Sequence, residues 1–399
     1  MFFFNCLSIL INCHDVIIRQ FINGILPNQF IRSIFYLGFT MTDKEFAVVY
    51  CEGLFGEMDG KTANGLARYS NKYEISGIID STKAGLDAGK VLDGEANEIT
   101  IYKDLQEALD GNGSSVTAFI YGMAPLSGAF SSIDRDVMFH AMELNLDIIN
   151  GLHDFLTDDE AFVKKAAECN VQLHDIRKQQ DIKQRSVFTG DIGKVECPKI
   201  AILGTDSAVG KRTTSVLLTQ ALQELGLNSV MIATGQTGVI QGAEFGVPLD
   251  ALKEQFISGE MEKAIVEAWE AAQPDIIILE GQGSLSHPAY LSSCFIIRGG
   301  QPEAIIVQHP PKRESLGDYP DIKMPRLEDE IELIEVFSKS PVIGIAINHE
   351  EMSDSEVNET IDSYQKQFEI PATDVLKFGC SSLIEKILTT FPQLQAKLT

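Results

Sequence analysis

The chain has 399 residues, of which 44% are hydrophobic and 22% are charged, and its formal net charge is -25. The length is sufficient for two domains, and the composition is typical of a globular protein that folds in water. The excess of negative charge argues against a general nucleic-acid or anionic-membrane surface, because such surfaces need clustered Lys and Arg. A local anion-binding site remains compatible with it.

The seven cysteines are scattered through the chain, and none forms a C-x-x-C pair. An odd number of separated cysteines predicts a reduced, cytoplasmic setting. No cluster of Cys and His has the spacing of a zinc site, so we expect no metal.

Residues 1–40 differ from the rest of the chain, because they are rich in Phe, Ile and Leu and contain a single acidic residue, Asp15. The apolar run at 7–13 is too short to span a bilayer, and the basic start and cleavage site of a secretory signal are not evident. We interpret this segment as a non-native or disordered extension, with the working protein beginning at Met41. A peripheral membrane anchor is the alternative.

In residues 41–177, short apolar runs alternate with segments of helical spacing, and this pattern predicts a Rossmann-like α/β domain with a small parallel sheet. The second expected strand ends at Asp80, where a βαβ unit often presents an acidic residue. The expected strands are 46–51, 73–80, 99–102 and 115–121, and the expected helices are 105–109, 135–150 and 158–170.

The polar stretch that begins at residue 178 is the best candidate for a linker, which we place at 178–197, before a second domain at 198–399. The strands of this second half are apolar throughout, so both of their faces must be covered, which predicts a doubly wound P-loop domain. Its expected strands are 199–203, 229–234, 275–279, 304–307 and 342–347, and its expected helices are 213–225, 260–272, 328–339 and 358–368.

A phosphate-binding loop is predicted where the first strand of this half leads through a tight turn, closed by Gly210 and Lys211, into a helix. Backbone amides, the helix N-terminus and a lysine attract an anion there, although a plain glycine-rich turn is the alternative. Five residues separate Gly204 from Gly210 instead of four, and Arg212 replaces the usual Ser or Thr, which weakens the case for magnesium. The predicted cofactor-binding residues are Gly204, Thr205, Asp206, Ser207, Ala208, Val209, Gly210, Lys211, Arg212 and Thr213.

A second constellation begins at Glu280, which ends an apolar strand and precedes Gly281 and Gly283. It resembles a Walker B element, in which an acid lies beside the phosphates and holds a metal or accepts a proton. His287 follows in the same expected crevice and is suited to take a proton from an attacking amine. A strand-capping acid and a structural histidine are the alternatives.

Two adjacent cations, Lys312 and Arg313, follow a strand end and suit the recognition of a carboxylate, unless they belong to a solvated surface loop. The glycine-bearing loop at 234–238 should lie on the same crevice edge as the phosphate-binding loop. In the first half, the weaker candidates to face a small acidic ligand are Glu52-Gly53, Lys61-Thr62 and Arg68, and ordinary surface charges are the alternative.

The loop at 204–211, together with E-G-Q-G at 280–283, resembles the nucleotide site of dethiobiotin synthetase and the cobyrinic acid amidases. A closer resemblance covers nearly all of the chain after residue 41, and it is to a two-domain P-loop family that includes D-glutamate N-acetyltransferases. The segments that carry it are KTANGLARY at 61–69, GLH at 151–153, DIR at 175–177, the loop, EGQGSLSHPAY at 280–290 and HPPKR at 309–313.

This resemblance implies transfer of an acetyl group from acetyl-CoA to the amine of a small amino acid, D-glutamate, with the CoA phosphates in the loop. Glu280 or His287 would then deprotonate the amine, and Lys211 or the loop amides would stabilise the oxyanion. Lys312 and Arg313, with His309, would hold the substrate carboxylates.

Two other functions remain open at this point. One is an ATP- and magnesium-dependent ligase or carboxylase of the dethiobiotin synthetase type, in which Asp206, Thr213 and Glu280 would hold the metal. The other is a non-catalytic nucleotide sensor. The sequence also leaves open the chirality of the substrate and the formation of a homo-oligomer.

Overall fold

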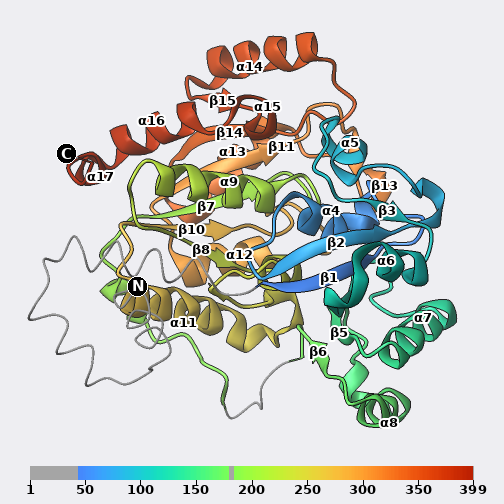
Figure 1. Ribbon diagram of the computed structural model, residues 1–399. Helices are drawn as coiled ribbons and strands as arrows, with labels where there is room; N and C mark the ends of the chain where they lie inside the picture. The colour runs from blue at the N-terminus through green and yellow to red at the C-terminus, as the bar shows by residue number, and fades with distance from the viewer. Residues whose placement is uncertain (1–43, 179–183, 399) are drawn as a thin grey trace, which may run out of the picture. The chain divides into compact units, whose positions relative to one another are not determined.

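The computed structural model describes residues 44–178 and 184–398, and Figure 1 shows how their helices and strands are arranged. The extension expected at 1–40, the start expected at Met41 and part of the linker expected at 178–197 lie outside these ranges and stay predictions. Within the two described stretches, no helix is long and apolar enough to cross a membrane.

The first half contains a parallel sheet in the strand order β3-β2-β1-β4-β5-β6. This is the order of a doubly wound Rossmann sheet, in which the direction of winding reverses between β1 and β4. The predicted Rossmann-like fold is therefore confirmed. The strands are β1 (Glu45–Tyr50), β2 (Tyr73–Ile79), β3 (Ile101–Tyr102), β4 (Val116–Tyr121), β5 (Asp147–Asn150) and β6 (Leu173–Asp175).

Several helices of this half begin where a side chain accepts hydrogen bonds from the free amides of the first turn. Asp104 caps α6, Asp159 caps α8, and Ser131 forms a capping box with Asp134 at α7. The helices are α4 (Lys61–Arg68), α5 (Ala88–Asp93), α6 (Leu105–Asn112), α7 (Ser132–Glu143) and α8 (Glu160–Cys169).

The prediction of one helix over 135–150 is wrong, because α7 ends at Glu143 and β5 follows within that range. Asn145 has a φ of 63°, a left-handed conformation that reverses the chain direction after a helix. Ile148 is then fully buried in the sheet. Apolar residues continue through the turn, so their spacing does not separate the helix from the strand.

The second half contains a seven-stranded parallel sheet in the order β15-β14-β11-β7-β10-β8-β9. The strand β7, which leads into the phosphate-binding loop, lies between β10 and β11. The strands are β7 (Lys199–Gly204), β8 (Ser229–Ala233), β9 (Phe245–Gly246), β10 (Ile276–Glu280), β11 (Ala304–His309), β14 (Val342–Ile347) and β15 (Ala372–Thr373), and β12 (Ser315–Leu316) pairs with β13 (Tyr319–Lys323) in a separate hairpin.

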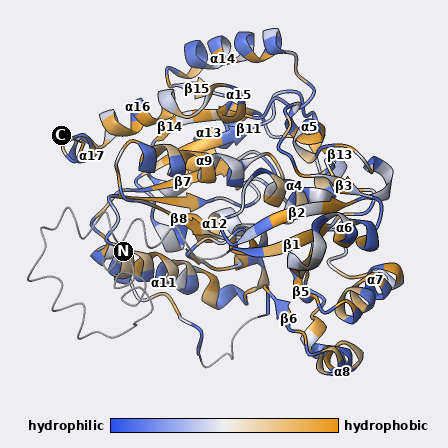
Figure 2. Ribbon diagram, viewed as in Figure 1, coloured by the Kyte–Doolittle hydropathy of each residue, from blue (hydrophilic) through white to orange (hydrophobic). Residues whose placement is uncertain are grey.

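Helices cover both faces of this sheet, and the hydrophobic strands between them are visible in Figure 2. Alternate residues of β7 belong to opposite cores: Ile200 packs with Leu218 of α9, and Ala201 packs with Met261 of α11. The predicted doubly wound domain is therefore confirmed. Its helices are α9 (Lys211–Glu224), α10 (Gln236–Ile240), α11 (Glu254–Ala272), α12 (Ser292–Gly300), α13 (Leu327–Ser338), α14 (Asp354–Phe368), α15 (Val375–Phe378), α16 (Ser381–Thr390) and α17 (Pro392–Gln395).

The sequence pattern gives no sign of α12, because two glycines at its end weaken its helical propensity. The structure explains both glycines by close packing. A Cβ atom on Gly299 would lie 2.5 Å from the carbonyl oxygen of Ser258, and one on Gly300 would lie 2.7 Å from the side chain of Leu279. These glycines let α12 approach both α11 and the sheet.

The helix α4 of the first half packs directly on the second half. The hydroxyls of Thr62 and Thr237 share a buried hydrogen bond of 2.8 Å, and Gln241 Nε2 donates to the carbonyl oxygen of Gly65 at 2.8 Å. Arg212 Nη2 donates to the carbonyl oxygen of Lys61 at 3.3 Å. A side chain on Gly65 would overlap Arg212, so this glycine is needed for the contact.

Arg177 makes a second connection, because its guanidinium bonds to residues of both halves. It donates to the carbonyl oxygen of Gly151 and, at 2.8 Å, to Gln236 Oε1. It also forms an ion pair of 2.5 Å with Asp250, and the arginine itself is buried. These bonds satisfy a cation that would otherwise be costly to remove from water.

We expect Arg177→Met to lower the free energy of unfolding by about 2 kcal/mol, because it leaves Asp250 and Gln236 without their partner. Urea unfolding measures the loss. Lys178→Met is the matched control, since its ion pair with Asp158 is exposed, and such a pair contributes less than about 1 kcal/mol. Equal effects of the two substitutions would contradict the assigned role of Arg177.

Candidate functional site

A cleft of about 860 Å³ lies where the carboxyl ends of strands from both sheets meet, and residues of both halves line it. Doubly wound sheets bind ligands at this edge, near the point where the strand order reverses. The first half contributes Lys61 after β1 and Ala124 after β4. The second half contributes the phosphate-binding loop and the ends of several strands.

The phosphate-binding loop has the geometry of an anion cradle. Ala208 and Gly210 have φ values of 48° and 108°, and this left-handed backbone turns successive amides toward one concave side. Among the described residues, no acceptor is found for the backbone amides of 208–213. The amides of 211–213 also form the N-terminus of α9, where negative charge is favoured.

Lys211 is buried beside this loop, and its ammonium donates to the carbonyl oxygen of Asp206. Burial lowers the pKa of Lys211 to about 8. Thr213 and Arg212 line the cleft with it. The structure therefore brings together the later residues of the predicted loop, from Ser207 onward, along one wall of the cleft.

Asp206 does not line the cleft, and protein donors already occupy both oxygens of its carboxylate. It accepts from the amide of Ser207 at 2.6 Å, from the amide of Gly317 at 2.8 Å and from Arg313 Nη1 at 2.9 Å. Burial raises its pKa, but contacts with His287 and these donors outweigh burial, so the pKa lies below its usual value. This donor set holds the loop in shape and does not fit a cation.

Glu280 ends β10 and is buried in the wall of the same cleft. One carboxylate oxygen accepts from the amides of Thr234 and Gly235 at 2.8 and 3.4 Å. Burial raises the pKa of Glu280, although the nearby Arg212 and Lys211 oppose this shift. The structure thus places the predicted acid beside the predicted loop.

His287 does not line the cleft, contrary to its expected place in the crevice. Its side chain is buried, and Nδ1 accepts from the amides of Ala289 and Tyr290 at 3.1 and 3.2 Å. Nε2 lies 3.4 Å from Oδ1 of Asp206. The ring stacks on Tyr290, which does line the cleft, so His287 supports the wall from behind.

The three residues expected to bind substrate carboxylates lie in three different surroundings. Arg313 lines the cleft, but it is bound by Asp206 and, at 2.7 Å, by Glu350. His309 is buried outside the cleft lining, where Nδ1 lies 2.9 Å from the hydroxyl of Thr205. Burial lowers the pKa of His309 to about 4, so it is neutral near pH 7.

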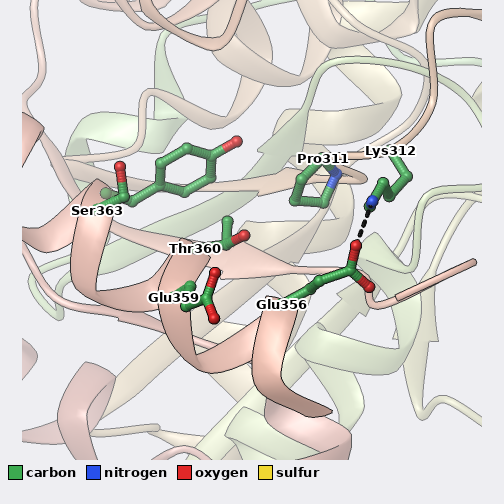
Figure 3. Close-up of a pocket in the computed structure, with 7 residues that line it drawn as sticks. Pro311, Lys312, Glu356, Glu359, Thr360 and Ser363 are labelled. Atoms are coloured by element: carbon green, nitrogen blue, oxygen red, sulfur yellow. Dashed lines mark hydrogen bonds and ion pairs between the residues drawn. The ribbon is translucent and has the colours of Figure 1, made fainter. Parts of the chain in front are cut away.

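Lys312 belongs to a separate shallow hollow formed with α14, shown in Figure 3. Its ammonium forms an ion pair with Glu356 there. Adjacent positions in the sequence therefore send Lys312 and Arg313 to different sites. The structure therefore does not bring these two expected carboxylate-binding residues together in one site.

The structure adds residues that no motif indicated. Asn348 and His349 follow β14, Asp374 follows β15, and all three line the cleft, with His349 Nδ1 2.6 Å from Asp374 Oδ2. The one sequence signal that could have indicated these residues is their position directly after the ends of strands, where parallel sheets bind ligands. The expectation that 234–238 lies on this edge is confirmed, because residues 235–237 line the cleft. No group of three or more His, Cys, Asp or Glu within 44–178 and 184–398 is arranged to hold a metal.

Comparisons with known proteins agree with this architecture. A family model for the P-loop domain of DUF1611, a domain of unknown function, matches residues 186–384, and its Rossmann-like N-terminal domain matches 81–179. The crystal structure of a DUF1611 family protein from Anabaena variabilis superposes with a TM-score of 0.79 at 28% identity, covering 87% of this chain and 100% of that one.

Two curated relatives are named D-glutamate N-acetyltransferase. The protein from a Pseudoalteromonas species is 32% identical over 275 residues, which cover 67% of this chain and 80% of the relative. The protein from Tritonibacter scottomollicae is 27% identical over 288 residues, which cover 70% of this chain and 83% of the relative.

We expect Gly281→Ala to lower the free energy of unfolding by about 2–4 kcal/mol, because the new Cβ would overlap the carbonyl oxygen of Ile202 in β7. Urea unfolding tests this. Gly193→Ala is the control, since nothing lies within 4 Å of its Cβ position, and a change within about 1 kcal/mol is expected. Wild-type stability of Gly281→Ala would show that the loop after β10 is not held against β7.

Proposed function

Because this chain belongs to the DUF1611 family and is similar to two proteins named D-glutamate N-acetyltransferase, we propose that it transfers an acetyl group from acetyl-CoA to the amine of D-glutamate. One structural observation supports this activity independently of the family. The cleft places a buried carboxylate, Glu280, beside a phosphate-binding loop whose amides at 208–213 have no acceptor in the described protein. A phosphate-bearing donor and an amine that must lose a proton would use these two features together.

The loop suits the donor without any hydrolysis of phosphate. CoA carries a pyrophosphate and a 3′-phosphate, and free amides at a helix N-terminus favour such anions. Arg212 occupies the position at which a nucleotide hydrolase has a magnesium-binding hydroxyl, and it adds a positive charge. The volume of the cleft, about 860 Å³, is in the range of small-molecule sites.

The reaction then needs a base, an oxyanion partner and a leaving group. Glu280, whose pKa is raised by burial, accepts a proton from the ammonium or attacking amine of the substrate. The amine nitrogen forms a bond to the thioester carbonyl carbon, and Lys211 with the loop amides stabilises the oxyanion. The carbon–sulfur bond breaks, and the CoA thiolate leaves and takes up a proton. His287 positions Asp206 and Tyr290 in this scheme.

The contacts of Asp206 support acyl transfer over an ATP- and magnesium-dependent ligase. That ligase would use Asp206 as a metal ligand, yet its oxygens accept from Arg313 and two backbone amides. A guanidinium bonded to the same carboxylate repels a cation. No comparable observation favours a non-catalytic sensor, which the following assay distinguishes.

We expect the protein to release free thiol and form N-acetyl-D-glutamate from acetyl-CoA and D-glutamate, without ATP and in the presence of EDTA. Thiol titration and mass spectrometry measure the two products. Lys211→Met should raise the KM for acetyl-CoA about tenfold or more, because it removes a charged donor from the loop. Product that requires ATP and magnesium would identify a ligase instead, and no turnover under either condition would favour a sensor.

We expect Glu280→Gln to lower kcat by about 10²–10⁴-fold, the usual contribution of a general base. The base must be ionised, so wild-type kcat/KM should fall as the pH drops through a pKa above the ordinary value for Glu. The variant should lack this acidic limb. Glu359→Gln, at an exposed carboxylate of α14, should leave rate and profile unchanged. Loss of the limb in His287→Gln but not in Glu280→Gln would assign the base to His287.

A further inference from the structure

The basic side chains of the cleft divide into two groups. Three arginines have carboxylate partners: Arg68 pairs with Asp93, Arg177 with Asp250, and Arg313 with Asp206 and Glu350. Among the described lysines and arginines that line the cleft, those with no carboxylate oxygen within 4.0 Å are Lys61, Lys211 and Arg212. Lys211 and Arg212 belong to the phosphate-binding loop, which leaves Lys61 as the cation from the first half without a partner.

Lys61 has a defined place opposite the loop. It is the first residue of α4, after β1, at the point where the strand order of the first sheet reverses. Its ammonium interacts through space with Asp318, Arg177 and Asp250, which all line the cleft. The bond between Thr62 and Thr237 and the contact of Arg212 with the Lys61 carbonyl fix this end of α4 on the second half.

Lys61 is partly buried in the wall of the cleft, and an ammonium there without a bonded counter-charge is unfavourable. Burial lowers the pKa of Lys61, and the nearby Arg177 adds to this effect, although Asp318, Asp250 and Asp59 oppose it. A ligand carboxylate would supply the missing partner. The substrate of the proposed reaction carries two carboxylates, while Arg313 is already bound and Lys312 lies in another hollow.

We propose that Lys61 binds a carboxylate of the amino-acid substrate, so that the substrate lies between the first half and Glu280. This inference rests on the proposed acetyl transfer and assigns its acceptor side to a residue outside the P-loop domain. Donor and acceptor are then held by different halves of the chain. The phosphate-binding loop holds the donor, and the start of α4 holds the acceptor.

Steady-state kinetics of Lys61→Met test this assignment. The KM for D-glutamate should rise about tenfold or more, as expected for loss of a charged hydrogen bond, while the KM for acetyl-CoA should change less than about twofold. Lys61→Arg should recover part of the loss. Lys90→Met is the control, because Lys90 is exposed on α5 and lies outside the cleft lining. An unchanged KM for D-glutamate, or a rise confined to acetyl-CoA, would overturn the proposal.

Calorimetric binding of D-glutamate separates this proposal from the proposed function. If the wild type binds D-glutamate without forming product and Lys61→Met binds it at least tenfold more weakly, the acetyl transfer fails and the subsite stands. If product forms and the variant binds as tightly as the wild type, the subsite fails and the acetyl transfer stands. No binding of D-glutamate by the folded wild type would overturn both.

Discussion

The packing of α4 on the phosphate-loop side of the second sheet is the constraint on which the cleft depends. Each sheet alone presents the carboxyl ends of its strands to solvent, which is an open surface rather than a cavity. The buried bond between Thr62 and Thr237 and the contacts of Gln241 and Arg212 with α4 turn the two edges toward each other. These three hydrogen bonds pair polar groups of one half with polar groups of the other across a buried contact, so they fix the position of α4 on the second half.

The net negative charge of the protein affects how the cleft can recognise anionic substrates. The chain has a net charge of -25, and both proposed substrates are anions, so the overall field does not attract them. The cations that the cleft gathers act over short distances, because salt screens exposed charges beyond about 8 Å at physiological ionic strength. Recognition therefore depends on individual partners inside the cleft, and the pairing of Arg68, Arg177 and Arg313 determines which cations stay available.

The sequence was sufficient to predict a Rossmann-like parallel sheet in the first half, a doubly wound sheet in the second half, and a loop between a strand and a helix at 204–211. Apolar runs, strand ends and the glycines around Lys211 are local signals, and each is completed within a few residues. The different surroundings of Lys312 and Arg313 were not predictable from such local signals. Their ion-pair partners, Glu356 and Glu350, come from segments some forty residues away. His287 was misplaced for the same reason: its neighbour Asp206 lies in another strand-end loop, and spacing along the chain says nothing about which side of Tyr290 the ring takes.

Arg212, the residue after Lys211, connects the phosphate-binding loop to the first half of the chain. Arg212 stands where a hydroxyl would bind magnesium, and it packs on the Gly65 backbone and donates to the carbonyl oxygen of Lys61. A substitution of Arg212 to Thr would supply the hydroxyl that the usual motif has at this position, although the extra residue between Gly204 and Gly210 would remain. It would also remove a contact that joins the two halves. The position after Lys211 therefore serves the association of the two halves, and a magnesium-binding hydroxyl there would come at the expense of that contact.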